Sequence, residues 1–365
     1  MCRDWSCRKK RLTIILVLIV LINLTGCSLF QFESKSAIDL KKDDQAKKVS
    51  LNRSFIKYRV GFSNGFSGNS WRAQMLASLK QESAKYPELE LIILDGQGNI
   101  GKQVNDIESL ITQQVDAIMV IPTSTDAISP TLKKAVDKGI KVINFNLPLD
   151  DPDSYTVYVG PDEKEKGRRW AEWLSSKLDG KGNIVVLGGM PGNPGTAAAL
   201  EGAREVFQKS DITVCAYRDA YWQEDRAKEI MLDLINTYDQ IDGVWSDGGQ
   251  VATGALKALL AANRPLVPIT GDDYNGLLKM YMTYHQQYPK FEFAVISSPT
   301  WQSKIVLQTA IKLINGEKTD KWIKLKPIII TKENIQQYIK TELEDYIFVD
   351  TDLPDDILKK ITNNN

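Results

Sequence analysis

The sequence predicts an α/β protein made of two lobes, each with a parallel sheet covered by helices on both faces. From Tyr58 onward, short apolar runs alternate with longer segments whose apolar residues recur at helical spacing. The runs are continuously apolar, as in strands that are buried on both faces of a parallel sheet. They are also too many for one comfortable sheet. We therefore divide them between two lobes, with the boundary near Gly160 and Pro161.

Predicted strands and predicted helices alternate along the chain, which is the order of βαβ units. The helical segments include SWRAQMLASLKQESAKY and DEKEKGRRWAEWLSSKL. The predicted strands, in chain order, are YRVGF, LELIILD, DAIMVIP, KVINFN, YTVYVG, GNIVVLGG, ITVCAY, DGVWSD, LVPITGDD and FEFAVISS.

The N-terminal residues do not belong to this pattern. Basic residues 8–11 precede an apolar run, 12–24, whose length and flank fit the core of a secretory signal peptide. The run ends in Leu-Thr-Gly-Cys, which resembles a bacterial lipobox and implies that residues 1–26 are removed and Cys27 is lipidated. An uncleaved anchor or a chance cysteine is the alternative. Residues 27–57 are polar and charged without a period, which predicts a flexible tether.

Composition narrows the function classes. The 365 residues include 46 Lys and Arg and 46 Asp and Glu, so formal net charge is zero and nothing favours a nucleic-acid partner. One histidine, His285, and one cysteine beyond the tether, Cys215, rule out most Ser-His-Asp, Cys-His and histidine-rich metal sites. Asp247, Asp272 and Asp273 lack metal-loop spacing, and we expect them to accept hydrogen bonds. We expect no catalytic residue, no metal and no cofactor.

Polar side chains gather where the predicted strands end. Open α/β sheets bind ligands outside the carboxyl ends of their strands, and small-molecule sites often lie between domains. Two lobes with facing polar strand ends would therefore form one site between them. The residues are Asn64, Asp95, Gln97, Asn144 and Asn146 in the first half and Asn193, Asp247, Asp272, Asp273, Ser297 and Ser298 in the second.

The stretch FSNGFSGNSWRAQM, residues 62–75, carries more hydrogen-bonding side chains than the other strand ends. Asn69 or Ser70 can cap the following helix, so turn and cap chemistry explains part of the motif. It does not explain Trp71 and Arg72 side by side on the first helical turn. An indole can cover the apolar face of a sugar ring, and a guanidinium can donate to ring oxygens and hydroxyls. The motif therefore predicts one wall of a sugar site.

The stretch GQGNIG, residues 96–101, gives the strongest rival signal because it matches the GxGxxG fingerprint of dinucleotide-binding enzymes. That fingerprint needs an acidic residue at the end of the next strand, whereas DAIMVIP has Asp116 at its start. The glycines also follow the second predicted strand, where Asp95 would lie beside a pyrophosphate. We interpret the stretch as a glycine-rich turn.

From about Tyr58 to about Ile330 the chain resembles the type I periplasmic substrate-binding proteins of sugar ABC importers, the ribose/galactose-binding group. The resemblance rests on FSNGFSGNSWRAQM, VDAIMVIPTSTDA, VWSDGGQVATGAL and ITGDDYNG, in this order behind a lipoprotein signal. It implies two Rossmann-like lobes joined by a three-strand hinge, with crossovers near Gly160, Ser298 and Leu325, that close on a ligand. The implied first lobe is 58–160 plus 299–325, and the second is 161–298 plus 326–365.

The resemblance also implies ligand positions. Asn69, Trp71 and Arg72 match positions in the first lobe, and Trp222, Asp247 and Asp273 match positions in the second. Relatives often carry arginine where this chain has Leu147 and where it has Ala199 or Leu200, and Ser298 replaces a common glutamine, so specificity should differ. With the polar strand ends, the predicted ligand-binding residues are Asn64, Phe66, Asn69, Trp71, Arg72, Gln97, Asn146, Asn193, Trp222, Asp247, Asp273 and Ser298.

These observations predict an extracytoplasmic, lipid-anchored protein that captures a sugar, either a monosaccharide or a small oligosaccharide. We expect it to act as a monomer and to deliver the sugar to the membrane subunits of an ABC importer, without covalent chemistry. One alternative is a sugar-sensing protein coupled to a receptor or kinase, and another is a nucleotide-dependent enzyme that uses GQGNIG. A LacI-type regulator would share the lobes but needs a helix-turn-helix where this chain has a secretion signal.

Overall fold

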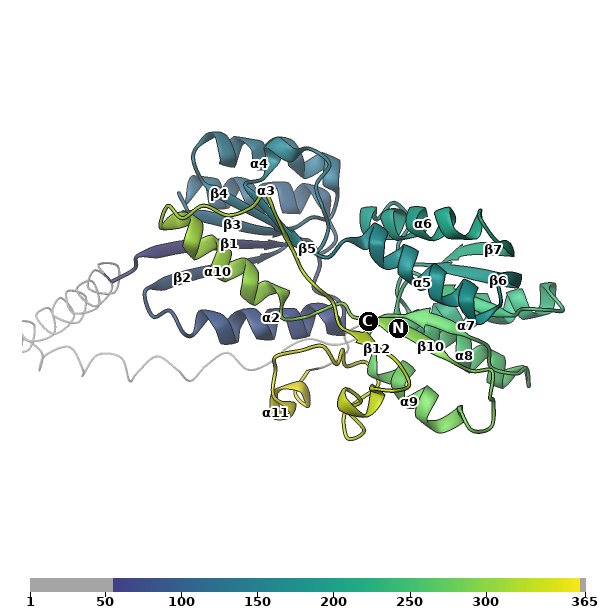
Figure 1. Cartoon of the computed structure of the whole chain (residues 1–365). Helices are drawn as coiled ribbons and strands as arrows, with labels where there is room; N and C mark the ends of the chain where they lie inside the picture. The colour runs from purple at the N-terminus through teal and green to yellow at the C-terminus, as the bar shows by residue number, and fades with distance from the viewer. Residues whose placement is uncertain (1–54, 362–365) are drawn as a thin grey trace, which may run out of the picture. The chain divides into compact units, whose positions relative to one another are not determined.

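The predicted strands form two separate six-stranded sheets in the computed structural model, which describes residues 55–361. The first sheet has the order β11-β5-β4-β3-β1-β2, and all its pairs are parallel (Figure 1). We call this sheet and its helices lobe 1. Its strands are β1 (Tyr58–Asn64), β2 (Leu89–Asp95), β3 (Ala117–Ile121), β4 (Lys141–Phe145), β5 (Val157–Gly160) and β11 (Trp322–Lys324).

The second sheet, in lobe 2, has the order β12-β10-β9-β8-β6-β7. Its pairs are parallel except for β10 with β12, which is antiparallel. Its strands are β6 (Lys181–Gly188), β7 (Asp211–Asp219), β8 (Gly243–Ser246), β9 (Ile269–Gly271), β10 (Phe293–Ile296) and β12 (Ile329–Ile330).

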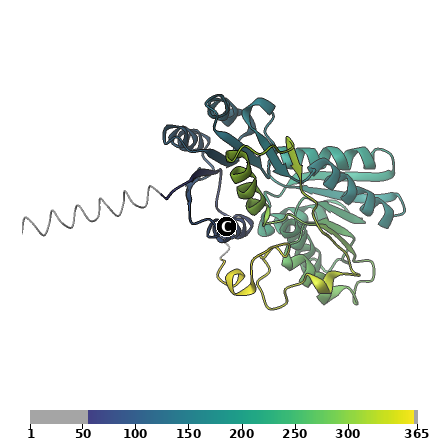
Figure 2. The same ribbon diagram turned by 60° about the vertical axis from the view of Figure 1, so that its left-hand side comes forward.

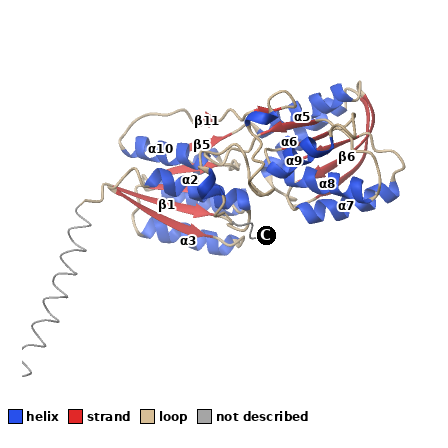
Figure 3. Cartoon of the chain, turned by 90° about the horizontal axis from the view of Figure 1, so that it is seen from below, coloured by secondary structure: helices blue, strands red, loops and turns tan. Residues whose placement is uncertain are grey.

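Helices cover both faces of each sheet, as Figure 3 shows in blue and red. In lobe 1, α3 (Ile100–Thr112) and α4 (Thr125–Asp137) share an apolar layer on one face, and α2 (Ser70–Ser83) and α10 (Gln302–Ile314) share the layer on the other. In lobe 2 one face is covered by α5 (Glu163–Lys177) and α6 (Pro194–Phe207), and the other by α7 (Glu224–Thr237), α8 (Gly249–Ala261) and α9 (Asn275–Tyr284). Both faces being buried explains why the strands read as continuous apolar runs.

The chain crosses between the lobes three times, after β5, after β10 and between β11 and β12. The crossing segments bond one another, since Leu325 N donates to Gly160 O at 3.0 Å and Ser297 N donates to Ile328 O at 3.0 Å. Ile328 N also donates to the Ser297 hydroxyl at 2.9 Å. These three adjacent segments form the predicted three-strand hinge. The predicted fold class of two Rossmann-like lobes is confirmed.

The C-terminal segment, 331–361, contacts both lobes. Gln74 of α2 exchanges two hydrogen bonds of 2.9 Å with the backbone of Phe348, and Asn275 of α9 donates to carbonyl groups of the same segment. Figures 1 and 2 both draw its short helix α11 (Asp355–Leu358), in yellow, near α2. The resemblance implied that residues from 326 onward belong to the second lobe, and this segment also packs on α2 of the first.

The predicted signal peptide, the lipidation site Cys27 and nearly all of the predicted tether lie outside the described residues. The described body of the chain belongs to one compact unit that begins at Lys57. The predicted lobe boundaries remain a prediction, and so does the anchor.

Substitution of Gly167 tests the close contact between the backbones of α5 and α6. A Cβ atom at Gly167 would lie 2.0 Å from the carbonyl oxygen of Ala199, so Gly167→Ala must push two helix backbones apart. Such overpacking costs about 1–3 kcal/mol, which should appear as a lower free energy of unfolding in urea titrations. The matched control is Gly101→Ala in α3, whose Cβ would lie 3.4 Å from its nearest neighbour. The control should have an unchanged or slightly higher free energy of unfolding. Equal stabilities for the two variants would contradict the close packing of α5 against α6.

Candidate ligand-binding site

The end of β1 and the first turn of α2 place a buried cation in lobe 1. Arg72 is 8% exposed, and its Nη1 donates to Asn64 Oδ1 at 2.8 Å. The Asn64 amide in turn donates to the Ser67 hydroxyl at 2.7 Å. The other guanidinium nitrogens of Arg72 bond no described side chain or carbonyl, so their N–H groups are free for a ligand. Burial lowers the pKa of Arg72 to about 10 while the charge of Asp95 raises it, so the guanidinium stays charged at neutral pH.

Trp71 precedes Arg72 and contacts the hinge. Its Nε1 donates to the carbonyl oxygen of Ser298 at 2.8 Å, and its ring belongs to the apolar layer that includes Met75. The guanidinium carbon of Arg72 lies 5.4 Å from the centre of the indole ring, which is a cation–π distance. Trp71 is buried, so most of its surface is already used by contacts within the protein.

Asn69 and Phe66 lie on the loop that leads into α2. Asn69 caps the helix as predicted, because its Oδ1 accepts a hydrogen bond from Arg72 N at 2.9 Å. Phe66 is 41% exposed, and its ring lies over Gly68, where an added Cβ would come within 2.1 Å of the ring. An aromatic face therefore remains open to solvent close to the start of α2.

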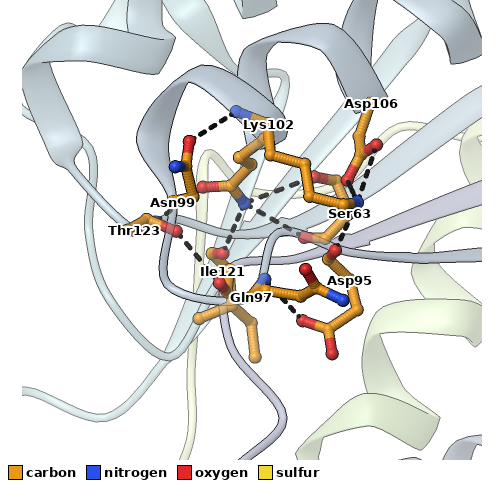
Figure 4. Close-up of polar contacts among 10 residues, drawn as sticks. Ser63, Asp95, Gln97, Asn99, Lys102, Asp106, Ile121 and Thr123 are labelled. Carbon is orange, nitrogen blue, oxygen red and sulfur yellow. Dashed lines mark hydrogen bonds and ion pairs between the residues drawn. The ribbon is translucent and has the colours of Figure 1, made fainter. Parts of the chain in front are cut away.

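The glycine-rich turn 96–101 is held to neighbouring strand ends by a polar network (Figure 4). Gln103 Nε2 donates to the Ile121 carbonyl at 2.9 Å, and Gln103 Oε1 accepts from Thr123 N at 2.7 Å. Gln97 lies on the exposed side of the turn with a φ of 55°. The turn is thus packed onto the ends of β1 and β3 by side chains of its own helix.

Two features distinguish this turn from a dinucleotide site. It follows β2, which is one of the two edge strands of the sheet. The nearby ammonium of Lys102 bonds the Asp95 carbonyl at 2.5 Å and pairs with Asp106 at 2.9 Å, as Figure 4 shows. The cation that would balance a pyrophosphate is therefore already paired. These contacts agree with the interpretation of GQGNIG as a structural turn.

Asp247 follows β8 and supplies a buried acceptor in lobe 2. Its side chain is 6% exposed, and its Oδ2 accepts a hydrogen bond from the Thr196 hydroxyl at 2.6 Å. Its other carboxylate oxygen accepts no hydrogen bond from a described residue. Burial raises the pKa of Asp247 to about 7, although the charge of Lys166 acts to lower it. Asp247 is therefore an acceptor with one oxygen free, close to its titration midpoint at neutral pH.

Trp222 is fixed beside Asp247 in a strained backbone conformation. Its φ is 53°, and that of the preceding Tyr221 is 58°, a region that bulky residues rarely adopt. The indole Nε1 donates to the carbonyl oxygen of Asp247 at 2.7 Å, and the ring lies against Gly189. Such strain persists where the surrounding structure holds a residue in place, and it gathers at ligand sites.

Lys166 is a site residue that was not predicted from the sequence. It lies near the start of α5, is 6% exposed, and its Nζ lies 2.7 Å from Glu163 Oε2. Burial acts to lower its pKa, but the carboxylates of Glu163 and Asp247 raise the pKa above its usual value, so it stays charged. The signal in the sequence was its spacing, because it lies four residues before the buried Trp170 on the same helix face.

Asp273 and Ser298 meet at the hinge. Asp273 Oδ1 accepts from Ser298 N at 2.7 Å, and its Oδ2 accepts from Asp350 N at 2.6 Å. Asp273 is fully buried, and both of its oxygens are occupied by backbone amides. The two residues thus join lobe 2 to the second crossover and to the C-terminal segment, and their predicted contact with a ligand remains a prediction.

The carboxyl ends of the two sheets approach each other near Leu147 and Gly195. Leu147 follows β4, and its Cδ2 lies 3.4 Å from the position that a Cβ of Gly195 would occupy. Gly195 lies in the first turn of α6, which Asn193 caps. Asn146, with a φ of 65°, accepts a long 3.4 Å bond from Gln302. The loop after β4 in lobe 1 therefore lies against the first turn of α6 in lobe 2.

The assembled groups suit the binding of a polar ligand. Arg72 offers free donors in lobe 1, and Asp247 offers a free acceptor in lobe 2, with Trp222 beside it. Within residues 55–361 no group of three or more His, Cys, Asp or Glu side chains is placed to hold a metal ion. In the same part of the chain no helix is both long and apolar enough to span a membrane.

Comparison with known proteins identifies relatives. Residues 60–318 match the family model described as periplasmic binding protein domain. The chain is 33% identical over 273 residues to the xylitol-binding protein of Mycolicibacterium smegmatis, which covers 72% of this chain and 76% of that protein. It is 24% identical over 315 residues to the ribose import binding protein of Bacillus subtilis, covering 86% and 96% of the two chains.

Solved structures share the fold. An ABC transporter solute binding protein from Bacillus halodurans C-125, with bound myo-inositol, matches with a TM-score of 0.70 and 24% identity, over 77% of this chain and 97% of that one. The fructose binding periplasmic domain of a hybrid two-component system matches with a TM-score of 0.68 and 25% identity, over 77% and 92%. The predicted resemblance and fold class are confirmed.

The titration of Asp247 should make stability depend on pH. Burial raises its pKa in the folded protein to about 7, above the ordinary value of 3.8. The folded state therefore holds this proton more tightly, so Asp247 adds stability at low pH and loses that contribution as the pH rises through 7. Asp247→Asn lacks the titration, so the wild type should lose stability relative to the variant between pH 4 and 8, at about 1.4 kcal/mol per unit of pKa shift. Urea unfolding without ligand measures this difference, and a difference that is constant with pH would contradict the prediction.

Proposed function

This chain belongs to the periplasmic binding protein domain family, and on that basis we propose that it captures a neutral sugar or polyol between its lobes and delivers it to an ABC importer. The observation that carries the proposal is that Arg72 offers free donors in lobe 1 and that Asp247 offers a free acceptor in lobe 2. Both are buried at the carboxyl ends of parallel strands, one in each lobe. Ligands of open α/β sheets bind at this position.

The polarity of the site favours hydroxyl groups. Each sugar hydroxyl both donates and accepts a hydrogen bond, so it can bond a guanidinium on one side and a carboxylate on the other. The carboxylates Glu163 and Asp272 lie close enough to Lys166 and Asp247 to influence their pKa values. This excess of negative charge in lobe 2 opposes the binding of a sugar phosphate. A neutral polyol fits both lobes.

Delivery and location complete the proposal. We propose that the protein acts outside the cytoplasm as a monomer, held at a membrane by a lipid on Cys27, and that it passes its ligand to permease subunits without chemical change. Buried acyl chains contribute about 0.8 kcal/mol per CH₂ to such anchoring. Labelling with a fatty-acid analogue in the wild type and in Cys27→Ser tests the anchor.

A sensing role is the second candidate. The similarity to the fructose binding periplasmic domain of a hybrid two-component system favours it, because that binding domain belongs to a signalling system. Capture of the ligand would be identical in both roles. Uptake of labelled polyol by membrane vesicles, with and without the protein, separates transport from sensing.

Thermal unfolding of the full chain tests ligand capture. A ligand at 100 times its dissociation constant adds about 2.7 kcal/mol to the free energy of unfolding and raises Tm by several degrees. We expect this shift with at least one of xylitol, ribose and myo-inositol, which relatives bind by name or in a solved structure. NAD and ribose 5-phosphate serve as controls that should leave Tm unchanged. Stabilisation by NAD alone would instead support the dinucleotide-enzyme alternative.

Arg72→Met should weaken binding of the polyol that stabilises the wild type. A hydrogen bond to a charged group contributes about 1.5–3 kcal/mol, so its loss should raise Kd roughly tenfold to 100-fold. Isothermal titration calorimetry measures this change. Arg59→Met in β1 is the matched control, because the Arg59 guanidinium pairs with Glu90 at the surface. Equal Kd values for the two variants would place the ligand away from Arg72.

A further inference from the structure

Lys166 and Arg72 are the buried cationic side chains within residues 55–361, one in each lobe. The proposed function uses Arg72 as a donor and leaves Lys166 without a role. The main chain at Lys166 is fixed by helix packing, since the next residue, Gly167, allows α5 to touch the backbone of Ala199 in α6. A lysine at this position therefore projects from a rigid contact between two helices.

Three carboxylates act on the charge of the Lys166 ammonium. Asp247 is held against the same pair of helices, because it accepts from Thr196 of α6 and lies two residues after Trp245, whose Nε1 donates to the Gly167 carbonyl of α5 at 3.4 Å. Glu163 Oε2 lies 2.7 Å from Nζ, and the charges of Asp247 and Asp272 also raise the pKa of this lysine. The Nζ atom lies 5.0 Å from the centre of the Trp170 ring, so an aromatic face borders the ammonium as well. Glu163 lies in α5, whereas Asp247 and Asp272 follow β8 and β9, so carboxylates from three segments share Lys166 as their counter-charge.

The ionisation of Asp247 depends on this counter-charge. Its free oxygen can accept a ligand hydroxyl when the carboxylate is charged, whereas protonation adds a donor and removes acceptor capacity. Burial and the charges of Glu163 and Asp272 raise the pKa of Asp247, and Lys166 and the Thr196 hydroxyl lower it. These opposing effects leave its pKa at about 7. Loss of the nearby positive charge of Lys166 therefore changes the protonation state of Asp247 at neutral pH.

One further titratable side chain faces this group. Tyr217 of β7 feels the charge of Asp247, but burial and its bond to Asp219 raise its pKa well above the usual range. The phenol is therefore neutral and adds no charge at neutral pH. Lys166 is left as the titratable group in this set that favours the charged carboxylate.

We propose that Lys166 is a positioning residue of the ligand site, which holds the Asp247 carboxylate in the charged form that accepts a ligand hydroxyl. The inference rests on the proposed function, because it assigns Asp247 to the bound polyol. It gives the two buried cations different tasks: Arg72 donates to the ligand, and Lys166 acts through Asp247. The ligand that fits is one that places a hydroxyl donor at the free oxygen of Asp247.

Lys166→Met tests this role directly. In the full chain with ¹³C-labelled aspartate, the Asp247 carboxyl signal, assigned with Asp247→Asn, should titrate at least one pH unit higher in Lys166→Met than in the wild type. Xylitol affinity should fall about fivefold or more at pH 7, because raising the pKa of Asp247 from about 7 by one unit lowers its charged fraction from about one half to about one tenth. Most of the loss should be recovered at pH 9, where the carboxylate is charged again. A purely structural role would weaken binding equally at both pH values.

Lys164→Met is the matched control, because Lys164 also lies on α5 and pairs with two carboxylates, Glu201 and Glu205, but at the surface. It should leave the Asp247 titration and xylitol affinity unchanged. Glu163→Gln removes a like charge and should lower the pKa of Asp247, which is the opposite shift. Shifts of the same sign in Lys166→Met and Glu163→Gln would overturn the proposal.

The outcomes separate this inference from the proposed function. Failure of the wild type to bind xylitol or any other polyol counts against the function, whereas the NMR titration needs no ligand and decides the role of Lys166 alone. An unshifted Asp247 titration in Lys166→Met overturns the inference even if xylitol binds. Should Lys166→Met not fold, Lys166→Gln removes the same charge with a shorter polar side chain, and the same upward shift is required of it.

Discussion

The backbone of Ser298 connects the parts on which the ligand site depends. Its N–H donates to the buried carboxylate of Asp273, which also accepts from Asp350 N, and its carbonyl accepts from the Trp71 indole. Ser298, in the second crossover, is thereby bonded to Asp273, which follows β9. Asp273 also bonds the C-terminal segment, and Trp71 connects α2 to the same crossover. A buried amide left without a partner costs about 1–3 kcal/mol. This junction therefore restricts where the lobes can pivot.

Helix α2 carries this constraint into the site. Trp71 bonds the crossover, Arg72 holds the free donors, and Gln74 bonds both backbone groups of Phe348 in the C-terminal segment. These three side chains come from little more than one turn of a helix, so they move together. Any shift of Arg72 toward a ligand is then resisted or transmitted by the hinge and by the C-terminal segment. These contacts favour a hinge motion of rigid bodies over a local adjustment of one side chain.

The sequence predicted what is encoded locally and missed what depends on distant packing. The buried strands followed from their continuous apolar runs, and the cap at Asn69 followed from a short motif. The family resemblance assigned Asp273 to the ligand site, which stays a prediction, but nothing local in the sequence indicated its bonds to Ser298 and Asp350, which lie 25 and 77 residues away. Lys166 resembles a solvent-facing lysine in a charged helix. Its spacing of four residues from Trp170 is the local signal, whereas the burial itself follows from the packing of α5 against α6.

The cost of burying charge explains why a neutral ligand suits this site. A buried ion without partners costs several kcal/mol, so each buried cation needs compensation. Lys166 receives it from Glu163 and Asp247, whereas Arg72 bonds the neutral amide of Asn64. Lobe 2 thus has surplus acceptors and lobe 1 has surplus donors. A polyol satisfies both with hydroxyl groups and adds no charge that either lobe would have to balance. A charged ligand would balance the charge of one lobe but would add to the charge of the other. The pattern of hydroxyls, rather than net charge, therefore decides which ligand binds.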